Sequence, residues 1–223
     1  SLPAEGSLTY NGEEVQVGDQ IPSDDFENLV FTPDPDENGD DYASFDFTVN
    51  DGDDDSDPFT ISIDVRPIND PPTSADDQVI TDEDTSYSFT SDDFAYSDIE
   101  GDPFSHITIV TLPDEGVLTY NGNPVSIGDE IPSNDFGNLV FTPDLNENGN
   151  DYTTFDFTVN DGTDDSEVYT ISVDVTPIND PPTSADDEIL TPEDTPYSFT
   201  NDDFAFDDID GDAFNHITIV TLP

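Results

Sequence analysis

The chain has 223 residues and carries 56 acidic residues against one basic residue, for a net charge of −55. With a single Arg it is a poor partner for nucleic acid or an anionic membrane surface, which proteins recognise through Lys and Arg. No apolar run is long enough to span a bilayer, so membrane insertion is not expected. Cysteine is absent, so bound metal is the remaining way to stabilise a chain that repels itself this strongly.

The composition still predicts a folded protein. A hydrophobic content of 32% with this charge is typical of disorder, but 16 Phe and 8 Tyr recur at alternating positions. Of the 56 acidic residues, 43 are Asp. Asp favours turns and is a hard oxygen ligand, so its clustering at turns indicates cation binding rather than a solubilising tail.

The sequence repeats itself after 110 residues without insertion or deletion, as when 8–12 recurs as 118–122. A period of this length indicates a tandem array of whole domains. The segment Pro-Ile-Asn-Asp-Pro-Pro occurs at 67–72 and again at 177–182, and we interpret these as the first and second joints between domains. The predicted domains are the C-terminal part of one repeat at 1–69, a complete repeat at 70–179 and the N-terminal part of a third at 180–223.

Within the complete repeat, apolar and polar residues alternate with a period of two, as at 155–160 and 169–175. This pattern predicts half-buried antiparallel strands. Asn121-Gly122 predicts a hairpin turn, and no segment has the pattern of an amphipathic helix. Short strands separated by turn residues predict an all-β fold, a β-sandwich of the immunoglobulin-like class. The remaining strands are expected at 78–81, 86–90, 105–111, 116–120, 124–127 and 139–142.

Several motifs in fixed order resemble the cadherin-like tandem repeats of large secreted bacterial adhesins of the RTX type. The closest stretch runs from 47–52, with its Asp51-Gly52 turn, through the strand at 61–65 into Asn69-Asp70-Pro71-Pro72. Pro67 and Pro71 depart from the cadherin linker, since they stand where it has Asp and Asn. The further matching motifs are Glu83-Asp84-Thr85, the acidic run at 98–102, and Phe141-Thr142-Pro143-Asp144 before Asn148-Gly149. The resemblance implies calcium-dependent rods in cell-surface or released proteins.

The order of the strands predicts which acidic loops meet at a joint. The first strand of a domain carries Glu83 to the far end, and the second brings 98–102 back beside the incoming joint. The last strand leaves at the far end, so the turn at Asp161 also lies beside the incoming joint. Calcium takes about six to eight oxygen ligands, usually from several loops, and the converging residues supply them. The candidate calcium ligands are Asn69, Asp70, Asp98, Glu100, Asp102 and Asp161 at the first joint and Glu83, Asn179, Asp180, Asp208, Asp210 and Asp212 at the second, with Glu193 and Asp51 as repeat equivalents of Glu83 and Asp161.

Two further acidic loops, at 34–39 and 144–149, match the first half of an EF-hand calcium loop. The twelfth position of that loop should be Glu, but it is Phe45 in one copy and Phe155 in the other. An Asx turn leading into a strand explains the same residues. The sequence therefore leaves a second calcium site and a simple turn as equal alternatives.

No catalytic constellation emerges, so we do not expect an enzyme. His106 and His216 each begin an apolar strand, and a single His without Cys or a second His is typical of a structural residue. Nothing resembles a nucleophile elbow or an ordered triad. Tyr10 and Tyr120 precede Asn-Gly turns, where hairpin packing is favoured over stacking on a sugar.

The pattern predicts calcium-rigidified extender repeats of a giant extracellular adhesin or surface filament that mediates cell-surface and biofilm adhesion. The alternative is a calcium-dependent module that binds polysaccharide or pairs with like domains. No secretion signal begins the sequence, so we expect a mature segment or an internal piece. The partners would be neighbouring repeats, or head-to-tail copies if 180–223 of one chain completes 1–69 of another; excision from a continuous array explains these ends as well. A high-salt habitat would also suit so acidic a surface.

Overall fold

A computed structural model describes residues 1–221 and shows the predicted all-β fold. The chain divides into two compact units, which are considered separately. Unit 1 contains 1–72, 97–103 and 161–165, and unit 2 contains 73–96, 104–160 and the chain from Ser166 onward. In the described part, each helix is a single 3-10 turn, and none could cross a membrane. The domain boundaries at the two joints stay a prediction.

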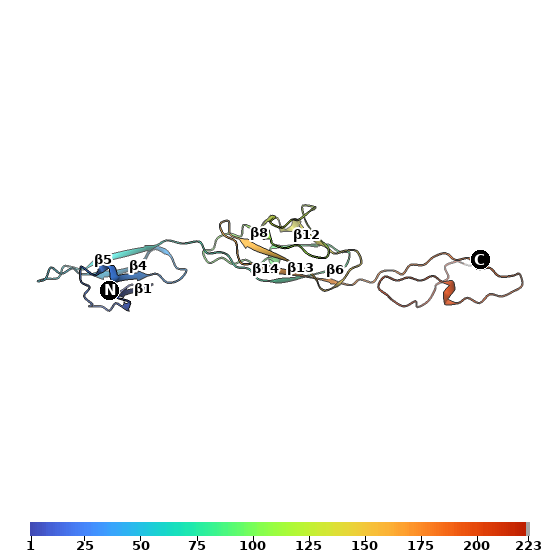
Figure 1. Cartoon of the computed structure of the whole chain (residues 1–223), viewed down its shortest axis with the longest axis horizontal. Helices are drawn as coiled ribbons and strands as arrows, with labels where there is room; N and C mark the ends of the chain where they lie inside the picture. Colours follow the sequence, from blue (N-terminus) through green and yellow to red (C-terminus); the bar gives the residue numbers. More distant parts are fainter. Residues whose placement is uncertain (222–223) are drawn as a thin grey trace. The chain divides into compact units, whose positions relative to one another are not determined.

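Unit 2 is built around a five-stranded sheet in the order β11-β8-β13-β14-β6. Its strands are antiparallel neighbours except for β6, which runs parallel to β14. Figure 1 shows β8, β13 and β14 side by side in this sheet. The strands are β6 (Asp77–Asp82), β8 (His106–Ile109), β11 (Glu130–Pro132), β13 (Gly149–Asn160) and β14 (Tyr169–Thr176).

A second, four-stranded sheet completes the sandwich in unit 2, in the order β10-β9-β12-β7. The turn between β9 and β10 is the predicted two-residue hairpin, with positive φ at both Asn121 and Gly122. Residues 91–93, 136–138 and 201–203 form short 3-10 turns, η2 (Ser91–Asp93), η3 (Phe136–Asn138) and η4 (Asn201–Asp203). The strands are β7 (Tyr87–Ser88), β9 (Val117–Tyr120), β10 (Asn123–Pro124) and β12 (Leu139–Thr142).

Aromatic side chains from both sheets fill the space between them. The ring of Phe89, beside β7, meets Phe155 of β13 edge to face at 5.5 Å between centroids. Phe94 packs on Phe136 at 4.7 Å and on Phe157 at 5.1 Å. These rings are almost fully buried, so the alternating Phe positions form the core. Such packing is the main source of stability in a chain without disulfides.

Unit 1 repeats part of this architecture with the same register. The pairs between β1 and β3, and between β4 and β5, are those of β9 with β12 and β13 with β14, shifted by 110 residues. Residues 1–69 have no counterpart of β6, β7 or β8, and Phe26 is 57% exposed whereas its equivalent Phe136 is 2% exposed. The elements are β1 (Ser7–Tyr10), β2 (Glu13–Glu14), η1 (Phe26–Asn28), β3 (Leu29–Thr32), β4 (Gly39–Phe47) and β5 (Phe59–Val65).

Two details of the predicted strands are wrong. The strand expected at 124–127 ends at Pro124, because the chain turns where the Ser126 amide donates to Asp129 Oδ2 at 2.8 Å. Strand β11 was not expected, since it ends in Pro132. It lies at the edge of the five-stranded sheet, where a proline does not interrupt a ladder. The predicted third repeat forms no strands in its described residues, 180–221. These residues form η4 and a bridge between Thr183 and Asp207, and the last two residues of the repeat lie outside the described residues.

Candidate metal sites at the joints

Hydrogen bonds at the first joint bring its polar residues to the predicted acidic loops. The side-chain amide of Asn69 donates to Asp161 Oδ2 and to Asp164 Oδ2, both at 2.9 Å. The backbone amide of Asp70 donates to Glu100 Oε2 at 3.2 Å. All five residues belong to unit 1. The strand order therefore predicts the right loops, while the role of these residues as ligands stays a prediction.

Asp161 organises the turn at this joint. Its Oδ1 accepts hydrogen bonds from the amides of Thr163 at 2.6 Å and Asp164 at 2.8 Å, and its side chain is buried. Burial raises the pKa of Asp161, but the bonds from Asp164, Asn69 and Thr163 lower it, and the net shift is downward. The carboxylate is therefore ionised and already oriented near neutral pH.

The acidic run at 98–102 supplies an orphaned oxygen. Asp98 Oδ1 accepts from the amide of Asp102 at 2.8 Å, across a turn in which Gly101 has φ +81°. Asp98 Oδ2 is buried and accepts no hydrogen bond. Buried carboxylate oxygens normally have a partner, and a cation is one that this donor set fits.

At the second joint, a buried carboxylate meets two others. Glu83 is only 4% exposed; its Oε1 accepts from the Ile178 amide and its Oε2 from Asn148 Nδ2 at 3.1 Å. The Asp180 amide donates to Asp210 Oδ2 at 2.7 Å. Carboxylate oxygens of Glu83, Asp180 and Asp210 lie within 4.8 Å of one another, all in unit 2. Among the three-carboxylate groups in the described residues, this trio is the one made up of predicted ligands.

Burial and the crowding of negative charge at the second joint raise the pKa of Asp180. The neighbouring carboxylates that raise it are those of Asp210, Asp84, Glu83 and Asp208. Like charges held this close disfavour one another's ionised forms. A divalent cation among them would remove the repulsion and favour the ionised carboxylates.

The remaining predicted residues lie in local turns. Asp208 Oδ1 accepts from the Asp212 amide at 3.0 Å, which repeats the turn of Asp98 and Asp102. Asn179 Nδ2 donates to the Asp180 carbonyl at 2.9 Å. Glu193 and Asp51 are exposed and belong to none of the three-carboxylate groups found in residues 1–221.

Sequence reasoning missed four residues that reach the joints: Asp164, Asp84, Asn146 and Asn148. The strand order carries Asp84, together with Glu83, to the end of the domain that meets the second joint, but only Glu83 was selected as a candidate ligand. Asn146 and Asn148 lie in the EF-hand-like loop, and the amide of Asn146 donates to Asp84 Oδ1 at 2.9 Å. This loop therefore contacts the turn that carries Glu83.

The acidic side chains of the loop at 144–149 form a separate exposed group with Glu115. Carboxylate oxygens of Glu115, Asp144 and Glu147 lie within 4.8 Å of one another, as do those of the equivalent residues 5, 34 and 37. Asp144 Oδ2 accepts from the Gly116 amide at 3.0 Å, and Glu147 accepts from the Tyr152 hydroxyl at 3.0 Å. A second cation site and a simple turn remain alternatives here.

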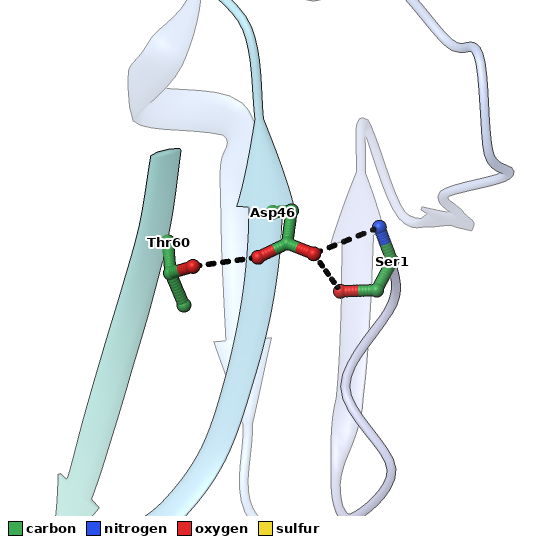
Figure 2. Close-up of polar contacts among 3 residues, drawn as sticks. All are labelled: Ser1, Asp46 and Thr60. Atoms are coloured by element: carbon green, nitrogen blue, oxygen red, sulfur yellow. Dashed lines mark hydrogen bonds and ion pairs between the residues drawn. The ribbon is translucent and has the colours of Figure 1, made fainter. Parts of the chain in front are cut away.

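The hydrogen bonds described here reach the carboxylates from neutral donors. Figure 2 shows Asp46, which accepts from the Thr60 hydroxyl at 2.7 Å and the Ser1 hydroxyl at 2.9 Å. These two bonds are the main causes that lower its pKa. Within residues 1–221, the ion pairs join Asp46 to the Ser1 amino group at 3.7 Å and Glu130 to His106 at 4.0 Å. Internal positive charge is therefore too scarce to balance the joints.

The side chains considered for other chemistry have structural partners. His106 Nδ1 lies 3.0 Å from the Ser105 hydroxyl, at the start of β8. The Tyr120 hydroxyl donates to Asp135, and its ring packs against the core. Hairpin packing therefore explains Tyr120 without a bound sugar.

Comparison with known proteins gives one match. A family model described as "Bacterial Ig domain" matches residues 2–64 and 69–174. The matched segments cover most of the chain, and the second of them begins inside the first joint, at residue 69. No curated protein matches, and no solved structure matches.

Proposed function

The chain belongs to the bacterial Ig domain family, and we propose that its repeats form a calcium-stiffened extender segment of a large surface adhesin of the RTX type. Domains of this family are often found at the bacterial surface and are typically non-enzymatic. The proposed role is therefore mechanical: the segment adds reach outside the cell and takes part in surface and biofilm adhesion.

The observation that carries the proposal is the trio of Glu83, Asp180 and Asp210. Three carboxylates offer up to six oxygens, which approaches the number that calcium needs, about six to eight. Glu83 precedes the joint by a whole domain, Asp180 lies in the joint, and Asp210 follows it. One ion bound to all three would tie the end of one repeat to the start of the next.

The proposed switch follows from charge. Without the ion, carboxylates within 4.8 Å of one another repel, and the joint opens. With the ion, the charge is neutralised and the angle between successive repeats is set. The prolines of the joint limit bending but supply no ligand side chains.

Calcium titration of the whole chain tests the proposal. Isothermal titration should show calcium binding that magnesium does not match, because magnesium demands a smaller, stricter octahedral site. Small-angle scattering and thermal unfolding should show a stiffer and more stable chain with calcium than with chelator. Sodium chloride at matched ionic strength is the control for general screening. An unchanged shape and melting temperature between calcium and chelator would refute the proposal. If sodium chloride has the same effect as calcium, the high-salt interpretation is favoured.

The alternative of polysaccharide binding gains no support from the surface of the complete repeat. Between residues 73 and 176, all of which are described, the exposed large hydrophobic side chains are aliphatic. Sugar stacking needs exposed aromatic faces. A glycan array with calcium present would reveal binding that this surface does not suggest.

A further inference from the structure

We propose that Asn146 is a switchable ligand of the second joint: its side-chain amide bridges two carboxylates in the absence of a cation and turns to coordinate one when it binds. This inference rests on the proposed calcium site and adds a residue to it. The loop at 144–149 then belongs to the joint instead of forming a separate EF-hand site.

The side chain of Asn146 lies between carboxylates from two different segments. With its nitrogen facing them, the amide donates to Asp84 Oδ2 at 3.3 Å and to Asp180 Oδ2 at 3.2 Å. Asp84 belongs to the turn that carries Glu83, and Asp180 belongs to the joint. One polar atom of Asn146 therefore touches both sides of the proposed site.

Hydrogen bonds to the turn that carries Glu83 hold the loop in this place. The Asn146 amide nitrogen of the main chain donates to Asp84 Oδ1 at 2.9 Å, and Asn148 Nδ2 donates to Glu83 Oε2 at 3.1 Å. Asn146 also has φ +57°, a conformation that Asn tolerates better than most residues. The loop that carries the Asn146 side chain is thus anchored to the turn of Glu83 and Asp84.

A side-chain amide suits both states of the site. Its nitrogen and oxygen have nearly the same shape, so a half turn about the Cβ–Cγ bond exchanges a donor for an acceptor. In the cation-free state, the NH₂ group offers hydrogen-bond donors to two carboxylates that would otherwise repel. In the bound state, the carbonyl oxygen adds a ligand to those of Glu83, Asp180 and Asp210.

The EF-hand alternative fits the loop less well. The twelfth position, where an EF-hand has its bidentate Glu, is Phe155, which is fully buried in the core. The two Asn side chains of the loop point instead to the carboxylates of Glu83, Asp84 and Asp180. The copies also differ at this position, since Asp36 stands in the first copy where Asn146 stands in the second.

The substitution Asn146→Asp distinguishes the ligand role from the bridging role. It should strengthen calcium binding but lower the stability of the calcium-free chain. An Asp keeps an oxygen ligand and adds charge, so calcium should bind roughly tenfold more tightly. It cannot donate, so the melting temperature in chelator should fall. Asn146→Gly tolerates the positive φ and removes the amide, so it should weaken calcium binding by roughly tenfold, the usual scale for a lost supporting group. Leu145→Ala, at a 76% exposed neighbour, is the control and should change neither.

The measurements are titration calorimetry with calcium and thermal unfolding in chelator, both on the whole chain. If the wild type binds calcium and all three variants bind it equally, the ligand role of Asn146 is wrong and the proposed function stands. If the wild type binds no calcium, the proposed function fails and the ligand role with it. An unchanged melting temperature of Asn146→Asp in chelator would overturn the bridging role.

Discussion

Glu83→Gln should stabilise the chain without calcium and weaken calcium binding. The Glu83 carboxylate lies within 4.8 Å of those of Asp180 and Asp210, so the substitution removes two of three repulsive pairs. At this distance each pair costs about 1 kcal/mol in water and about 3.5 kcal/mol at an effective dielectric constant of 20. Asp210 is exposed, which favours the lower figure, and the expected gain is about 2 kcal/mol. The Gln carbonyl can still accept from the Ile178 amide.

Thermal unfolding in chelator and calcium titration measure the two effects. The melting temperature should rise by several degrees in chelator, while the calcium affinity should fall at least about tenfold. Glu193→Gln is the matched control, because Glu193 is the exposed repeat equivalent outside any three-carboxylate group. The reasoning is refuted if Glu83→Gln lowers the melting temperature in chelator, since Glu83 would then act as a hydrogen-bond acceptor and not as a repelling charge.

Two further predictions concern the complete repeat. Gly116→Ala should destabilise it on the order of 1–3 kcal/mol more than Gly122→Ala does, as measured by urea unfolding. Both glycines have positive φ, but a Cβ at 116 would lie 2.6 Å from the Phe141 ring, whereas nothing lies within 4 Å of a Cβ at 122. Equal effects would contradict this packing. Burial and the hydrogen bond to Asp93 raise the pKa of Tyr87 from 10.0 to about 12, so its contribution to stability is full below pH 10 and is lost as the pH rises to about 12. Tyrosinate absorbance should show one fewer late-titrating tyrosine in Tyr87→Phe; an unchanged titration would rule out the raised pKa.

The fold was predictable where one face of a strand is buried. The alternation in 155–157 and 169–175 matches the burial of β13 and β14, because side chains of successive strand residues point to opposite faces. The hairpin at Asn121-Gly122 was predictable because few residue pairs adopt two successive positive φ values. Strand β11 was not, since three residues ending in proline carry no periodicity, and only the neighbouring strand β8 makes them a strand.

The site was predictable at the level of loops but not of side chains. Strand order places Asn69 near Asp161, and Glu83 near Asp180, whatever the details of packing. The contacts of Asp164 and Asn146 depend on how each turn orients its side chains, which residue type and spacing do not report. The repeat offset also made Glu193 look equivalent to Glu83, although only Glu83 has a joint after it among the described residues.

The distances at the second joint separate the effect of calcium from that of simple salt. At physiological ionic strength the Debye length is about 8 Å, so dissolved ions screen the distant charges of this surface but act weakly between carboxylates within 4.8 Å. Adding sodium chloride in chelator should therefore raise the stability of wild type and Glu83→Gln in parallel, so that Glu83→Gln stays the more stable of the two. Calcium should reverse this difference and make the wild type more stable, because a coordinated ion acts inside the trio. If sodium chloride alone removes the difference in stability between wild type and Glu83→Gln, the carboxylates are screened as surface charges and the joint needs no specific ion.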